Sequence, residues 1–229
     1  MGVAGGFCLP LPFGEKFAIL LLEWWQSNKR DFPWRRTADP YKILIAEMLL
    51  RKTTARQVEG VFERFISKFP DAKAIAEAQD EEIEEAIRPL GMEHKRADLL
   101  KKLAIELLKN HMGAIPATQE DLLRLPGVGR YVANAVLCFA YEKDAPLVDV
   151  NTIRVFQRVF GFESQRRRVK DDATLWELVA KMTPPGKAKV FNLAIIDFAH
   201  EICKSKNPKC ASCPLRAICK YANRRISED

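Results

Sequence analysis

Residues 125–136 read LPGVGRYVANAV, and this stretch decides how the chain around it folds. A proline and two glycines, Gly127 and Gly129, separate an amphipathic segment that ends near Leu123 from an apolar run over 130–140. The stretch therefore predicts a tight turn between two helices. Glycines let a backbone approach a ligand closely, and the N-terminus of the second helix favours an anion such as a phosphate. As a bare pattern, a Pro-Gly turn between two helices is more often only a turn.

Apolar residues recur at helical spacing along the rest of the chain, and almost no segment alternates apolar and polar residues as a strand would. Proline and glycine divide the chain into about ten short segments of this kind. The sequence therefore predicts an all-α fold. Three stripes carry the prediction: Phe17, Leu20, Leu21 and Trp24; Val58, Val61, Phe62, Phe65 and Ile66; and Leu99, Leu100, Leu103, Leu107 and Leu108.

The composition favours a globular protein with phosphate-bearing partners. The 229 residues include 37 Lys and Arg against 30 Asp and Glu, a net charge of +7, and a basic excess is typical of proteins that bind nucleic acid. No run approaches the roughly 18–20 apolar residues of a membrane span. Residues 1–12 lack a cationic region before an apolar stretch, so we expect no secretory signal and a cytoplasmic, intracellular protein.

Four cysteines crowd the C-terminal part of the chain, spaced as Cys203-x6-Cys210-x2-Cys213-x5-Cys219. In a cytosolic protein such a cluster favours a metal centre over disulfides. A structural zinc site is the alternative, although zinc sites with four thiolates usually pair two C-x2-C units. Only one such pair occurs here, and the spacing suits an iron–sulfur cluster held by one loop. We therefore expect a [4Fe-4S] cluster within 203–219, with Cys8 and Cys138 outside it.

Over about residues 15–220 the chain resembles the helix-hairpin-helix (HhH-GPD) DNA glycosylases with an iron–sulfur loop. This superfamily includes endonuclease III, the MutY adenine glycosylases and the archaeal Mig-type thymine mismatch glycosylases, and the resemblance to the Mig-type enzymes is strongest. Besides the four cysteines, the segments that carry it are RDFPWR (30–35), DPYKILIAEMLLRKTT (39–54), PLGMEHKRA (89–97), LPGVGRYVANAV (125–136) and LVDVNTIRV (147–155).

The resemblance implies two helical lobes and a nucleic-acid partner. A six-helix lobe with the hairpin would span 33–143, and a second lobe would combine 1–32 with 144–229 and carry the cluster loop 203–219. The partner would be double-stranded DNA with a mismatched base, bound by a monomer in association with the nucleoid.

The resemblance assigns the catalytic role to Asp149, which would stabilise an oxocarbenium-like sugar cation and activate water. Because a helical stretch follows, Asp149 also suits a helix N-cap. Glu47 lies in an apolar run where a functional carboxyl fits. The matching glutamate protonates the leaving adenine in MutY-like enzymes and resembles a base-pocket residue in the thymine enzymes. The alternative for Glu47 is a side-chain pair with Arg51 one helical turn later.

Tyr131 stands where bifunctional relatives carry a Schiff-base lysine, and a phenol cannot form that imine. The resemblance thus implies base excision without strand cleavage, with Tyr131 lining the base pocket. Lys52 and Met92 match positions from which relatives insert side chains into the duplex; the alternatives are a surface lysine and a loop methionine that covers the core. Arg154 suits either an ion pair or a phosphate contact. The hairpin residues that would bind DNA are Leu125, Gly127, Val128, Gly129 and Arg130.

The function that these implications favour is a monofunctional DNA glycosylase of base excision repair that flips and hydrolytically excises thymine or uracil from T·G and U·G mismatches. A MutY-like adenine glycosylase acting on A·G or A·8-oxoG is the alternative, but residues 50–54 replace the Gln-rich segment typical of MutY. Two further alternatives are a non-catalytic module that binds damaged DNA and a bifunctional lyase that uses another amine, such as that of Lys52.

Overall fold

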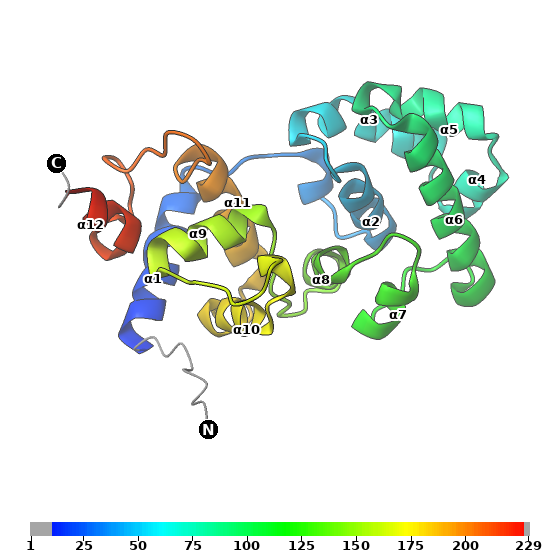
Figure 1. The fold of residues 1–229 in the computed structure, drawn as a ribbon. Coiled ribbons are helices and arrows are strands. Elements are labelled where there is room, and N and C mark those ends of the chain that lie inside the picture. The colour runs from blue at the N-terminus through cyan, green and yellow to red at the C-terminus, as the bar shows by residue number, and fades with distance from the viewer. Residues whose placement is uncertain (1–10, 227–229) are drawn as a thin grey trace. The chain divides into compact units, whose positions relative to one another are not determined.

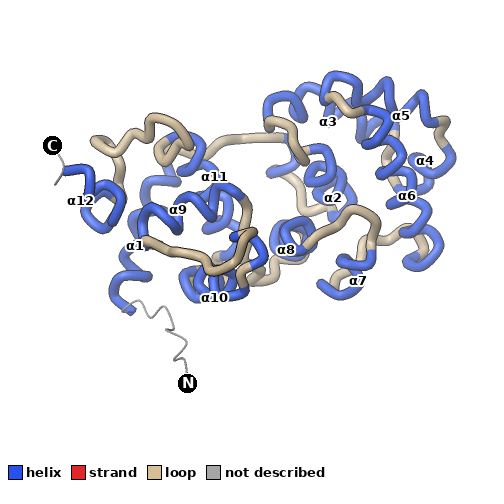
Figure 2. The backbone as a smooth tube through the Cα atoms, in the orientation of Figure 1, coloured by secondary structure: helices blue, strands red, loops and turns tan. Residues whose placement is uncertain are grey.

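The structure is a computed structural model and describes residues 11–226; Cys8 and most of the 1–12 segment lie outside the described residues. Within this part of the chain all regular structure is helical, with twelve α-helices, four short 3-10 helices and no strand (Figures 1 and 2). The prediction of an all-α fold is thus confirmed for the described chain. None of the helices found there has the length and apolarity that crossing a bilayer requires.

The chain folds as two compact units. One comprises Met1–Arg30 and Asp144–Asp229, and the other comprises Asp31–Lys143. The predicted boundary between the lobes lies after residue 32, whereas the observed boundary lies after residue 30, so residues 31 and 32 belong to the hairpin unit.

The unit 31–143 surrounds the apolar helix α2. Asp39 caps this helix, because its side chain accepts hydrogen bonds from the main-chain N–H groups of Tyr41 and Lys42, and Pro40 occupies the first turn. Every residue over 43–49 is buried, which explains why α2 reads as apolar on all sides. The helices of this unit are α2 (Pro40–Leu49), α3 (Ala55–Lys68), α4 (Ala72–Glu77), α5 (Asp80–Ile87), α6 (Glu93–His111), α7 (Gln119–Arg124) and α8 (Arg130–Phe139), with 3-10 turns η1 (Pro33–Arg35) and η2 (Arg88–Leu90).

Two packing arrangements organise this unit. Helix α8 packs on α2, and α7 packs on α8, so the predicted hairpin is attached to the central helix. The long helix α6 packs against α4 and α5, which cover its apolar face. The apolar stripes predicted for α3 and α6 are largely buried, although Leu108 is 37% exposed.

The other unit is built on aromatic packing. Phe17 makes edge-to-face contacts with Phe156, Phe160 and Phe191 at centroid distances of 4.9–6.0 Å, an arrangement that suits the ring quadrupoles. These contacts join its three main helices. The helices of this unit are α1 (Leu11–Gln26), α9 (Val150–Phe160), α10 (Ala173–Met182), α11 (Ala188–Glu201) and α12 (Lys220–Ile226), with 3-10 turns η3 (Val169–Asp171) and η4 (Arg216–Ile218).

The tryptophan pair on α1 differs from the predicted stripe in one detail. Trp24, predicted in the core, is only half-buried and packs edge-to-face on Phe198. Its neighbour Trp25 is buried and donates its indole N–H to the Asp197 carboxylate at 2.8 Å. Helical spacing alone favoured Trp24 as the buried tryptophan. The buried Asp197 carboxylate needs a hydrogen-bond donor, however, and the indole of Trp25 supplies one.

Candidate functional site

Asp149 lies at the N-terminus of α9 and caps it. Its Oδ1 accepts hydrogen bonds from the main-chain N–H groups of Asn151 (2.9 Å) and Thr152 (2.8 Å). Its Oδ2 accepts one from the side-chain amide of Asn151 at 2.7 Å. The carboxylate is half-buried, while Val150 beside it is 73% exposed. The N-cap interpretation of Asp149 is therefore confirmed.

A chain of hydrogen bonds continues from this carboxylate along α9. The side-chain oxygen of Asn151 accepts from Arg154 Nη2 at 3.0 Å. Arg154 also donates to the carbonyl oxygens of Cys203 (2.7 Å) and Ala199 (3.0 Å). Arg154 thus binds neutral main-chain oxygens of its own unit, which neither expectation for it had foreseen. The orientation of Asp149 is linked through two side chains to the first cysteine of the C-terminal loop.

The hairpin forms as predicted, between α7 and α8. The predicted helix ends near Leu123 and at Arg130 agree with the observed ends to within one residue. Leu125 and Val128 are buried, 2% and 7% exposed, and the Val128 N–H donates to the Leu125 carbonyl at 3.1 Å. Two apolar anchors thus hold the turn to the core.

The glycines and Arg130 of the hairpin are exposed. Gly127 has φ +77°, a conformation that other residues rarely adopt, and an added Cβ would lie 2.9 Å from Arg51 Nη1 and from the Leu99 methyl groups. Gly129 is the N-cap of α8 and supplies no capping side chain; an added Cβ there would meet nothing within 4 Å. The N-terminus of α8 therefore has open space beside it, as a phosphate site requires.

Glu47 and Tyr131 lie in the same unit on helices that pack together. Glu47 is buried on α2, only 6% exposed, and Tyr131 is half-buried in the first turn of α8. Arg51, the predicted partner of Glu47, donates from Nη1 to the Gly127 carbonyl at 3.2 Å and so joins the end of α2 to the hairpin.

Lys52 and Met92 share an unusual backbone conformation and line one cavity. Both residues have left-handed backbones, with φ +56° and +57°, in loops that follow α2 and precede α6. Met92 is 49% exposed, and Lys52 is exposed. The cavity has a volume of about 170 Å³, and its lining also includes Arg51, Lys95 and Arg96. Four cations therefore surround this hollow, and the structure brings the two predicted insertion residues together.

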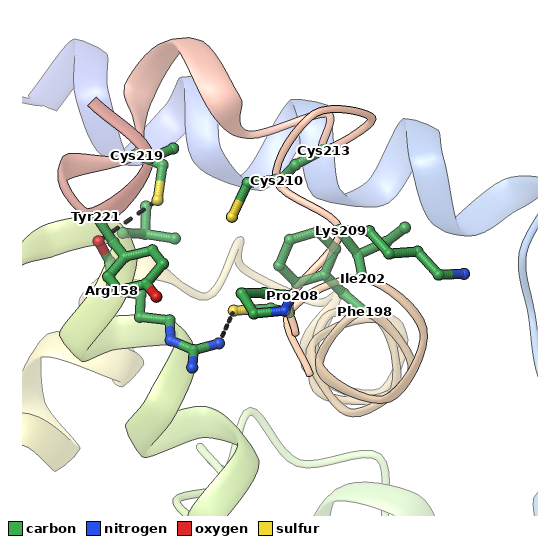
Figure 3. Close-up of a pocket in the computed structure, with 12 residues that line it drawn as sticks. Arg158, Phe198, Ile202, Pro208, Lys209, Cys210, Cys213, Cys219 and Tyr221 are labelled. Carbon is green, nitrogen blue, oxygen red and sulfur yellow. Dashed lines mark hydrogen bonds between the residues drawn. The ribbon is translucent and has the colours of Figure 1, made fainter. Parts of the chain in front are cut away.

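The four cysteines of the C-terminal loop line one pocket beside α9. Arg158 of α9 donates from Nη1 to the Cys203 sulfur at 3.5 Å and to the Lys204 carbonyl at 2.6 Å, and the Cys219 sulfur donates to the Arg158 carbonyl at 3.5 Å. Figure 3 shows the Cys210 and Cys219 sulfur atoms pointing to the side on which Arg158 lies. The cysteines that line the pocket are Cys203, Cys210, Cys213 and Cys219.

Cys203 and Cys219 are buried in this pocket, and Cys210 and Cys213 are half-buried. Burial raises the pKa of the Cys213 thiol to about 12, and the neighbouring cysteines add to the rise. Burial also raises the pKa of Cys219. Across the described residues, no three His, Cys, Asp or Glu side chains approach closely enough to share a single metal ion.

Sequence analysis missed Arg96, a buried arginine on α6. It is 8% exposed and binds both loops beside the cavity. The available signal was its helical phase, because Arg96, Leu100, Leu103 and Leu107 follow one another at helical spacing. A charged residue on the same helix face as these leucines is expected to be buried and hydrogen-bonded.

Comparisons with known proteins agree with the motifs. The family model of the HhH-GPD superfamily base excision DNA repair proteins matches residues 45–181. The thymine/uracil-DNA glycosylase of Pyrobaculum aerophilum is 44% identical, over 92% of this chain and 93% of the relative. The adenine DNA glycosylase of Mycolicibacterium smegmatis is 34% identical, over 86% of this chain and 67% of the relative. A solved structure described as a thermostable thymine-DNA glycosylase superposes with a TM-score of 0.89 at 38% identity, over 93% of this chain and 98% of that one. The chain therefore belongs to the HhH-GPD superfamily of base excision DNA repair proteins.

Proposed function

We propose that the protein is a monofunctional DNA glycosylase that hydrolyses the N-glycosidic bond of thymine or uracil mispaired with guanine. The observation that carries the proposal is the similarity to a thymine/uracil-DNA glycosylase over nine-tenths of both chains. The identity to an adenine DNA glycosylase is ten percentage points lower, 34% against 44%.

Asp149 is the proposed catalytic carboxylate. Cleavage of the glycosidic bond develops positive charge on the sugar, and a fixed carboxylate stabilises that charge. The N–H groups of Asn151 and Thr152 fix Oδ1, and the Asn151 amide orients Oδ2. Asp149 needs little reorganisation when the charge develops, and it can accept a proton from the attacking water.

The proposed lack of strand cleavage follows from the residue at position 131. A lyase forms an imine between an amine and the sugar, and the phenol of Tyr131 has no nitrogen to form it. Tyr131 would instead pack beside the flipped base, with Glu47 as a second residue of the base pocket.

DNA would be held by the hairpin and by the two loops of the cavity. The exposed Gly127, Gly129 and Arg130 are proposed to bind a phosphate at the N-terminus of α8, while Leu125 and Val128 anchor the turn. Of Lys52 and Met92, one would fill the hole that the flipped nucleotide leaves and the other would lie beside the orphan base, which offsets part of the cost of unstacking.

We propose that Cys203, Cys210, Cys213 and Cys219 hold a [4Fe-4S] cluster. The four residues line one pocket, and only one C-x2-C unit is present, whereas zinc sites with four thiolates usually pair two such units. A cluster spreads its ligands over four iron atoms. It would fix the loop that Arg154 and Arg158 bind. Iron and acid-labile sulfide without zinc in the purified protein would support the cluster, and stoichiometric zinc would contradict it.

Base release from labelled duplexes tests the proposed activity. Duplexes with one T·G, U·G or A·G mismatch are incubated with the protein, with and without alkali. We expect release from T·G and U·G, with strand scission only after alkali. Release only from A·G would identify an adenine glycosylase, scission without alkali would identify a lyase, and no release from any duplex would favour a non-catalytic binding module.

A further inference from the structure

Arg96 connects the two loops that carry Lys52 and Met92. Its Nε donates to the Gly91 carbonyl at 2.9 Å, one residue before Met92. On the other side, Nη2 donates to the Arg51 carbonyl at 2.7 Å and to the Thr53 hydroxyl, the two residues that flank Lys52. One guanidinium group thus binds the main chain next to both predicted insertion residues.

The same side chain binds the end of α2. Nη1 of Arg96 donates to the Leu49 carbonyl at 3.1 Å, and Leu49 is the last residue of that helix. The planar guanidinium therefore uses all three nitrogens in fixed directions, which a lysine cannot reproduce. The two loops are held relative to the buried core of the unit as well as to each other.

The charge of Arg96 is buried without a carboxylate among its hydrogen-bond acceptors. These acceptors are three main-chain carbonyls and one hydroxyl. Burial lowers the pKa of Arg96, and the nearby positive charge of Arg51 adds to the effect. Burying a cation beside other cations is unfavourable for folding. A residue that only stabilised the core would not need this arrangement.

Both insertion residues also adopt a backbone that is rare outside glycine. Lys52 has φ +56° and Met92 has φ +57°. Such conformations persist where the surroundings fix them, and they are enriched at functional sites. Here the surrounding contact on both sides is Arg96, because its acceptors lie within one residue of each strained position.

We propose that Arg96 is a positioning residue for nucleotide flipping. It holds the Lys52 and Met92 loops in the one geometry from which both side chains enter the duplex together. This inference deepens the proposed function and depends on it. A flipped nucleotide is stable only while its place in the stack is filled, so Arg96 acts on the flipping equilibrium and leaves the phosphate contacts intact.

The test compares Arg96→Met with Lys101→Met, a matched control on the same helix. Lys101 donates to the Ala78 carbonyl at 2.8 Å and to Asp80 at 2.6 Å, away from both loops. Flipping is followed by the fluorescence of 2-aminopurine placed next to the mismatch in a T·G duplex. Single-turnover excision and affinity for a fully paired duplex are measured on the same proteins, at a temperature where circular dichroism shows each variant folded.

We expect Arg96→Met to lower the flipping signal and the single-turnover rate at least tenfold, while affinity for paired DNA changes less than twofold. Arg96→Lys should recover only part of the loss, and Lys101→Met should match the wild type. Equal flipping in Arg96→Met and Lys101→Met would overturn the inference, as would a loss of paired-DNA affinity that accounts for the whole effect.

Thr53→Ala keeps the experiment decisive if Arg96→Met does not fold. It removes one acceptor of Arg96 and leaves the guanidinium in place. A several-fold loss of flipping with unchanged paired-DNA affinity would support the inference, and unchanged flipping would overturn it. A wild-type protein that neither flips nor excises would instead refute the proposed function, so the two failures are distinguishable.

Discussion

The helices α8 and α9 begin in opposite ways. Helix α8 starts after Gly129, which has no side chain, and an added Cβ there would meet nothing within 4 Å. Helix α9 starts after Asp149, whose carboxylate accepts from the N–H groups of Asn151 and Thr152. One N-terminus has room for an anion from outside, whereas the other already binds an anion of its own chain.

Under the proposed function, the same physical feature of a helix serves two purposes. The first turn of a helix carries unpaired N–H groups and partial positive charge. At α8, where glycine leaves the first turn open, a DNA phosphate is proposed to bind. At α9, Asp149 fills the first turn, and its carboxylate is the proposed catalytic group. Which of the two applies depends on the residue at the N-cap.

The largest effect is expected for Asp149→Asn. Asparagine caps a helix about as well as aspartate, so the free energy of unfolding should change by less than about 0.5 kcal/mol. The charge that stabilises the sugar cation is lost, and single-turnover base release from T·G should fall by about 10³-fold.

Asp149→Ala is the matched control, since it removes the charge and the cap together. It should lose as much activity as Asp149→Asn and also about 1 kcal/mol of stability, measured by urea denaturation. Substantial base release by Asp149→Asn would show that another group stabilises the sugar cation.

The second effect concerns the turn that leads into α8. Gly127→Ala forces a left-handed backbone on alanine and places its Cβ 2.9 Å from the Leu99 methyl groups, so we expect a loss of about 2 kcal/mol in urea denaturation. The same substitution at Gly60, inside α3 with nothing within 4 Å of the new Cβ, should instead stabilise the protein by up to about 1 kcal/mol. If the two substitutions changed the free energy of unfolding in the same direction, the conformation assigned to Gly127 would not be what distinguishes the two sites.

The third effect makes α8 resemble α9. Gly129→Asp introduces a capping carboxylate where a phosphate is proposed to bind, so the Kd for a T·G duplex should rise about tenfold while stability is kept. Gly129→Ser also caps the helix but adds no charge, and its Kd should change less than twofold. If serine weakens binding as much as aspartate does, bulk rather than charge is responsible and the phosphate site is wrong.

The smallest effect is expected for Asn151→Ala. It removes the side-chain contact to Asp149 Oδ2 but keeps the main-chain cap on Oδ1. We expect the single-turnover rate to fall about three- to tenfold, because one hydrogen bond that orients the carboxylate contributes about 1 kcal/mol. Stopped-flow single-turnover kinetics measure it, and an unchanged rate would show that Oδ1 alone fixes the carboxylate.

Some features were predictable from sequence because they depend on local chemistry. The hairpin ends were predicted to within one residue, since Pro126 fixes its own φ and Gly127 permits the left-handed backbone that the turn needs. The N-cap interpretation of Asp149 depended only on the helical stretch that follows it. The observed cap is compatible with the proposed catalytic role. The left-handed backbones of Lys52 and Met92 were not predictable. Nothing in either side chain favours them, and the residues beside them bind Arg96, which lies more than forty residues from Lys52 in sequence.

The most direct test of the contrast between α8 and α9 measures Kd and the saturating single-turnover rate for Asp149→Asn and Gly129→Asp on one T·G duplex. The account predicts opposite profiles: Asp149→Asn binds like the wild type and does not release base, whereas Gly129→Asp binds weakly but releases base at a near-normal rate once saturated. If both variants lose binding and rate together in the same proportion, the two helix N-termini do not have separate roles and the account is wrong.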